Sequence, residues 1–191
     1  MVLPSSRTQK DLDTWDAALK AYDSEDFDAA LSIFEQMFDD PKALMNLGLI
    51  HMYQGNFGLA ISKFVDTVRL DRSLAVGYFQ RGVCHYKLKA MDKALQDFSD
   101  AEFMMRGNDI VDYEELGLHF QLRADKILLN KGLALIEIGR KYEGMNLLLQ
   151  FGTTNAKPEL YSMVRSDFLV RFSSPKIASQ KAFGNLVSYC L

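Results

Sequence analysis

The sequence has few of the features that mark secreted, disulfide-bonded or membrane-spanning proteins. Its 191 residues include two cysteines, too few for a disulfide framework, and Cys84 falls in an apolar helical pattern typical of a core residue. No stretch approaches the roughly 18 apolar residues of a membrane-spanning helix, and the first residues lack the apolar core of a signal peptide. We therefore expect a reducing, cytoplasmic compartment and no direct membrane insertion.

The chain also has no large excess of positive or negative charge. The formal net charge is −3 and the isoelectric point is about 5.6, so there is no electrostatic case for a nucleic-acid partner. From Lys157 onward, however, five basic residues stand against two acidic ones, a net charge of +3, which leaves −6 on the first 156 residues. A solvated basic tail and a tail that docks on the acidic body both fit this asymmetry.

Motifs for catalysis are missing as well. The three histidines, His51, His85 and His119, have no cysteine or carboxylate at metal-ligand spacing, and no glycine-rich phosphate loop, nucleophile elbow or zinc motif is present. His51 and His85 are equivalent in the repeat described below, which favours packing on a helix face. We expect no enzymatic activity, cofactor or metal; a metal bound at either of these two histidines would reverse that expectation.

What the sequence does contain is an internal repeat of 34 residues, the period of the tetratricopeptide helix pair. Small residues at two positions allow the two helices to cross closely, and phenylalanine fills the wedge between one pair and the next. These residues are Gly48, Ala60 and Phe64 in one copy and Gly82, Ala94 and Phe98 in the next. Looser copies are Ala18, Ala30 and Phe34, 30 residues before the first of these, and Gly132, Gly144 and Leu148, 50 residues after the second.

These copies predict the fold. The expected repeats are about 11–40, 41–74, 75–105 and 125–153. Because a lone helix pair cannot bury its apolar face, stacked pairs are required, and we predict an all-α tetratricopeptide-repeat α-solenoid of four repeats within residues 1–156. Residues 157–191 are predicted to form a capping helix, at about 159–170, and a tail.

The 50-residue step leaves 16 extra residues between the third and fourth copies, within about 104–124. This run begins with the turn-forming cluster Arg106-Gly107-Asn108-Asp109 and continues with the apolar pair Ile110-Val111. A hairpin-like insertion fits this pattern better than a continuous helix. Insertions in a solenoid collect on one edge, so this edge is the best candidate for a specific binding surface.

The concave groove of the solenoid is the other candidate surface. Chaperone-associated tetratricopeptide domains clamp a peptide carboxylate there with a fixed set of lysine, arginine and asparagine side chains. Only Asn46 matches that set; the first-repeat positions hold Trp15 and Leu19, and the third-repeat positions hold Val76 and Gln80. Neutral or apolar side chains cannot neutralise a carboxylate, so we exclude this clamp and expect a structural role for Asn46. A general scaffold that holds a peptide or its own tail in the groove remains an alternative function.

At the insertion edge the sequence resembles a specific family. The resemblance covers roughly residues 11–150 and is carried by four segments: LAVGYFQRG at 74–82, RGN at 106–108, Asp112-Tyr113, and LGLHF at 116–120. These segments resemble the N-terminal domain of the Rac-dependent NADPH oxidase activator subunit, neutrophil cytosol factor two, and its fungal NoxR counterpart.

The resemblance implies an adaptor. In that family the insertion and the loops between repeats dock a GTP-bound Rac-type small GTPase, which brings the adaptor from the cytoplasm to a membrane NADPH oxidase subunit for superoxide production. The positions that match are Arg106, Asn108, Ile110 and Asp112 in the insertion, and Asp71 and Ser73 in the loop after the second repeat. The resemblance implies an apolar contact from Ile110 and polar contacts from the others. Formation of a turn is the alternative role for Asn108 and Asp112.

Overall fold

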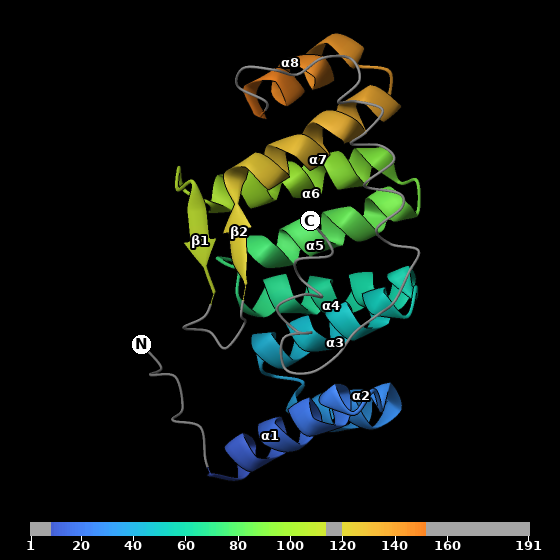
Figure 1. Ribbon diagram of the computed structural model, residues 1–191, viewed down its shortest axis with the longest axis vertical. Helices are drawn as coiled ribbons and strands as arrows, with labels where there is room; N and C mark the ends of the chain where they lie inside the picture. Colours follow the sequence, from blue (N-terminus) through green and yellow to red (C-terminus); the bar gives the residue numbers. More distant parts are fainter. Residues whose placement is uncertain (1–8, 114–119, 152–191) are drawn as a thin grey trace.

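The computed structural model describes residues 9–113 and 120–151. In these residues eight α-helices follow one another as antiparallel pairs that stack in chain order, and a two-stranded hairpin separates the third pair from the fourth (Figure 1). The helices are α1 Gln9–Asp23, α2 Phe27–Phe34, α3 Pro41–Tyr53, α4 Phe57–Leu70, α5 Ala75–Lys87, α6 Met91–Met104, α7 Ala124–Glu137 and α8 Lys141–Phe151. A 3-10 helix, η1 Glu35–Met37, extends α2, and the strands are β1 Ile110–Asp112 and β2 Gln121–Arg123.

The helix pairs lie close to the expected repeat ranges. The first helices of the first and last pairs, α1 and α7, begin just before their ranges, at Gln9 and Ala124, and the hairpin lies within residues 104–124. The predicted capping helix, the tail and His119 lie outside the described residues. Within the described segments, no helix has the length and apolar character needed to cross a membrane.

Local chemistry explains where several helices begin and end. Asp40 caps α3 through a 2.8 Å hydrogen bond from the Lys42 N–H, and Pro41 occupies the first turn, where a missing N–H costs nothing. Within each pair, the link between the helices contains one residue in the left-handed region of backbone space. These residues are Glu25, Gly55, Lys89 and Gly139, with φ of 60°, 78°, 61° and 89°. They reverse the chain within a few residues.

The repeated small residues are explained by close packing within each pair. A Cβ atom added at Gly82 would lie 2.7 Å from the Phe98 ring, and one added at Gly48 would collide with the Phe64 ring. In these two pairs the glycine therefore makes room for the phenylalanine of the second helix. In the last pair, Gly132 faces Gly144, and the two backbones approach each other directly, as the sequence predicts.

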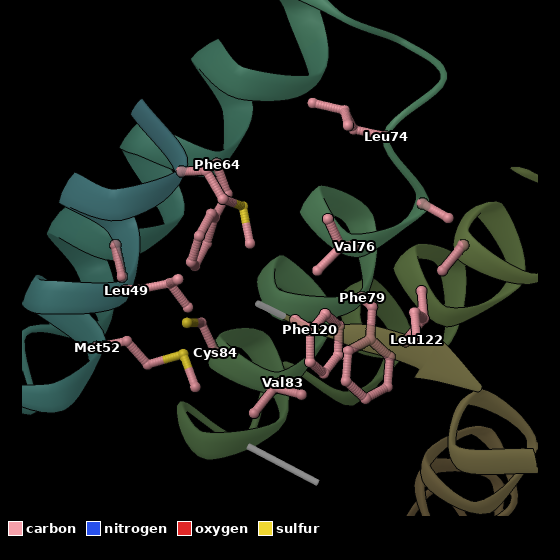
Figure 2. Packing of buried hydrophobic residues seen from close by; sticks show 14 of the residues in the cluster. Leu49, Met52, Phe64, Leu74, Val76, Phe79, Val83, Cys84, Phe120 and Leu122 are labelled. Atoms are coloured by element: carbon pink, nitrogen blue, oxygen red, sulfur yellow. The ribbon is translucent and has the colours of Figure 1, made fainter. Parts of the chain in front are cut away.

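The buried core runs through the whole stack, and the hairpin contributes to it. Cys84 is fully buried, as predicted. Figure 2 shows Phe120 and Leu122, from the end of the insertion, among the buried side chains of α5, including Phe79. The insertion is therefore attached to the solenoid by apolar contacts at the edge where the loops between pairs also lie (Figure 1).

Candidate protein-binding edge

The insertion begins at a sharp turn that holds Arg106 outward. Arg106 has a φ of 53° and Gly107 a φ of 78°, a conformation that costs roughly 1–2 kcal/mol for a residue with a side chain. The Arg106 N–H donates to the Phe103 carbonyl at 3.1 Å, and its side chain is exposed. The same conformation follows α1 at Glu25 and α5 at Lys89, so at Arg106 it ends α6 and starts the insertion.

Asn108 fixes this turn. Its backbone N–H and its Nδ2 both donate to the Met105 carbonyl oxygen, each at 2.9 Å. The structure therefore gives Asn108 the turn-forming role that was the alternative for it, and its amide nitrogen is engaged within the chain.

The two strands present Ile110 and Asp112 on one exposed face. Pairing is antiparallel, with Ile110 opposite Arg123, Val111 opposite Leu122 and Asp112 opposite Gln121. Since side chains alternate along a strand, Val111 and Leu122 turn toward the core, where Leu122 is fully buried. Ile110 keeps 46% of its side-chain surface exposed. Asp112 Oδ2 accepts a 2.7 Å hydrogen bond from Gln121 Nε2 across the pair.

The loop between α4 and α5 carries the remaining predicted residues. Asp71 Oδ1 accepts hydrogen bonds from the Ser73 N–H at 2.9 Å and from the Ser73 hydroxyl at 2.6 Å. This arrangement stiffens the loop. Ser73 is exposed and Asp71 is half-buried.

Tyr113, for which the sequence suggests no role, joins this loop region to the hairpin. Its side chain is 3% exposed and its hydroxyl oxygen accepts a 3.2 Å hydrogen bond from the Val76 N–H, in the first turn of α5. Burial and, to a smaller extent, the nearby Asp71 carboxylate raise the pKa of Tyr113 to about 12. The two predicted segments, 71–73 and 106–112, therefore lie at one edge. We call Asp71, Ser73, Arg106, Asn108, Ile110 and Asp112 the hairpin edge.

The repeat-equivalent histidines have different surroundings. His85 Nδ1 lies 2.7 Å from Asp97 Oδ2, and Arg81 donates to Asp97 Oδ1 through Nε at 3.0 Å and a terminal nitrogen at 2.6 Å. His51 is buried, and its pKa is lowered by burial and then by the positive charge of Lys63. Among residues 9–113 and 120–151, no three histidine, cysteine or carboxylate side chains come together as a metal site.

The groove face carries a row of carboxamides at one repeat position. Asn46, Gln80 and Asn130 each stand two residues before the repeat glycine. Two residues turn a helix by about 200°, so these side chains point away from the helix that packs on the glycine. They are 1%, 0% and 2% exposed. Their side-chain oxygens have no hydrogen-bond partner among the described residues.

Sequence comparisons identify relatives of this chain, although no protein-family model matches it. NADPH oxidase activator 1 from Rattus norvegicus is 33% identical over 137 residues, which is 71% of this chain. Neutrophil cytosol factor 2 from Bos taurus is 36% identical over 117 residues, 61% of this chain. The chain spans 31% and 22% of the lengths of these two relatives. The predicted resemblance is confirmed.

Solved structures confirm the predicted fold class. The type III secretion chaperone SycD of Yersinia enterocolitica, in complex with a peptide of the translocator YopD, has a TM-score of 0.58 at 14% identity, over 71% of this chain and 99% of that one. The N-terminal domain of stress-induced protein-1 from C. elegans has a TM-score of 0.51 at 19% identity, over 68% of this chain and 95% of that one. These similarities show that the chain is a tetratricopeptide solenoid.

Proposed function

We propose that this tetratricopeptide domain, related in sequence to the NADPH oxidase activators, is a regulatory adaptor whose hairpin edge binds the GTP-bound form of a Rac-type small GTPase. The observation that carries the proposal is the hydrogen bond between Tyr113 and the Val76 N–H. It joins the loop that contains Asp71 and Ser73 to the insertion, so that residues 33 to 41 positions apart in the sequence offer one surface.

The chemistry of this surface suits a polar partner. The Arg106 guanidinium presents a planar fork of donors that matches carboxylate and carbonyl groups. Asp112 and Asp71 present acceptors, and Ile110 adds an apolar contact. Because the edge is small and mostly polar, we expect a transient interface with a Kd on the order of micromolar.

Selectivity for the nucleotide state would arise in the partner. The γ-phosphate orders the switch segments of a small GTPase, and hydrolysis releases them. A rigid hairpin edge recognises the ordered arrangement and loses its contacts when the segments relax. The GTPase would then recruit the adaptor from the cytoplasm to a membrane NADPH oxidase and promote its activation, directly at the membrane subunit or through the tail.

Calorimetric titration tests this function. The chain is titrated with a Rac-type GTPase loaded with a non-hydrolysable GTP analogue, and separately with the GDP-loaded form. We expect binding to the GTP form and a loss on the order of 2 kcal/mol, about 30-fold in Kd, in Arg106→Glu. Arg140→Glu is the matched control, since Arg140 is an exposed arginine in the α7–α8 link, at the other end of the helices. Equal affinity for both nucleotide forms, or equal losses in both variants, would contradict the proposal.

A second candidate is a general scaffold in which the groove holds an extended peptide; because the amides of the carboxamide row are 0–2% exposed, the peptide would have to displace the atoms that cover them. Neutral amides hydrogen-bond the main chain of a peptide without requiring a charge, and buried amide oxygens without partners are uncommon in folded proteins. Gln80→Leu removes the middle amide at similar volume. If the GTPase bound through the groove, Gln80→Leu would weaken the calorimetric signal and Arg106→Glu would leave it unchanged.

A further inference from the structure

The N-terminus of α5 has no capping side chain of its own. The first four N–H groups of a helix lack partners within the helix, and a polar side chain at the preceding residue usually accepts from one of them. Asp40 does this for α3. At α5 the corresponding residue is Leu74, which is apolar and makes no such hydrogen bond. Helices α4, α6 and α7 also begin without a side-chain hydrogen bond from the N-cap residue; at α5 an acceptor comes from elsewhere in the chain.

Tyr113 supplies that acceptor from the insertion, 37 residues further along the chain. Its hydroxyl oxygen accepts from the Val76 N–H at 3.2 Å in a buried setting, and hydrogen bonds from the backbone of Val76 and of Ala75 both act on the phenol. The insertion thus provides the cap for a helix of the preceding repeat.

Phe120 contacts both the backbone and the ring of Tyr113, which keeps the hydroxyl beside α5. The Tyr113 N–H donates to the Phe120 carbonyl at 2.9 Å. The two rings stack with centroids 6.3 Å apart and planes 13° apart. Phe120 in turn lies in the buried cluster with the α5 side chains (Figure 2).

We propose that Tyr113 is a positioning residue of the hairpin edge: its hydroxyl caps α5 and fixes the insertion relative to the α4–α5 loop. This inference rests on the proposed function, since it assumes that one partner contacts both segments of the hairpin edge. It explains how Asp71 and Asp112 keep a constant spacing for that partner. Burial of the ring alone would hold the hairpin near the solenoid without setting this spacing. Removal of the hydroxyl separates these two contributions.

The test compares Tyr113→Phe with Tyr142→Phe in the full chain. Both variants lose one phenolic hydroxyl, but Tyr142 is 90% exposed on α8, far from the hairpin. Amide hydrogen exchange of Val76 is measured together with that of Leu49, a core amide in α3. We expect Tyr113→Phe to accelerate exchange at Val76 about five-fold, the effect of one net hydrogen bond, and to leave Leu49 within two-fold of the unmodified chain. Tyr142→Phe should change neither.

The same variants are then titrated with the GTPase loaded with the GTP analogue. We expect Tyr113→Phe to raise the Kd about three- to ten-fold, and Tyr142→Phe to leave it unchanged. Unchanged exchange at Val76 would overturn the cap, and faster exchange with an unchanged Kd would overturn the positioning role. Equal acceleration at Val76 and Leu49 would indicate global destabilisation and would also overturn it. If the unmodified chain binds neither nucleotide form, the proposed function fails, and exchange at Val76 alone decides whether Tyr113 fixes the insertion.

Discussion

Replacement of Gly82 by alanine tests why the repeat requires a small residue. The new Cβ would lie 2.7 and 2.8 Å from two Phe98 ring atoms and 3.1 Å from Asp97 Cβ, closer than van der Waals contact permits. Phe98 is fully buried and cannot move into solvent. Overpacking of a dense core costs roughly 1–3 kcal/mol. Alanine also has a higher helix propensity than glycine, by about 1 kcal/mol, and this gain in stability offsets part of the overpacking cost.

A matched variant removes the helix-propensity contribution. Gly58 lies in the first turn of α4, is exposed, and a Cβ there would have no atom within 4 Å. Gly58→Ala gains propensity without overpacking, so the difference between the two variants isolates the packing cost. Chemical denaturation should place Gly82→Ala about 1–3 kcal/mol below Gly58→Ala in free energy of unfolding. Equal stability of the two variants would refute the packing argument.

Two further predictions concern charged groups in the core. The pKa of His51 is lowered from 6.5 by burial and by Lys63, so the unfolded chain takes up the proton more readily and stability is lost as the pH falls below about 6.5. The drop in thermal midpoint between pH 7 and pH 5 should be smaller in His51→Gln than in the unmodified chain. An equal drop in both would show that His51 is not the source of the pH dependence. Asp97→Asn removes the carboxylate that pairs with Arg81. Urea denaturation should show a free energy of unfolding lower by about 2–3 kcal/mol, which is less than the loss for a fully buried pair because Arg81 stays partly exposed. A cost below 0.5 kcal/mol would show that the pair contributes little.

The helix pairs could be predicted from the sequence because their signals are local and periodic. A glycine or alanine and a phenylalanine recur at fixed spacing, and each marks a contact within a pair, as Gly82 and Phe98 do. The turn at Arg106-Gly107-Asn108 was predictable for the same reason, since turn chemistry depends on neighbouring residues. The exact contact was less predictable, because the spacing does not say whether a glycine faces a ring or another backbone.

The contacts that organise the candidate site are long-range and have no periodic signal. Tyr113 and Val76 are 37 residues apart, and no local pattern in the sequence pairs them. His85 and Asp97 lie on different helices, so metal-ligand spacing within one helix does not find them. The positions of the hairpin edge came from the family resemblance; the sequence alone did not predict the contact that brings its two segments together.

Amide hydrogen exchange of the chain, with and without the GTP-loaded GTPase, tests most directly whether the hairpin edge is the binding surface. Binding there predicts slower exchange at 71–73 and 106–112, with no change at Asn46, Gln80 and Asn130 in the groove. The GDP-loaded GTPase should slow exchange at neither place. Slower exchange at Asn46, Gln80 and Asn130 with unchanged exchange at the hairpin edge would contradict the proposed site.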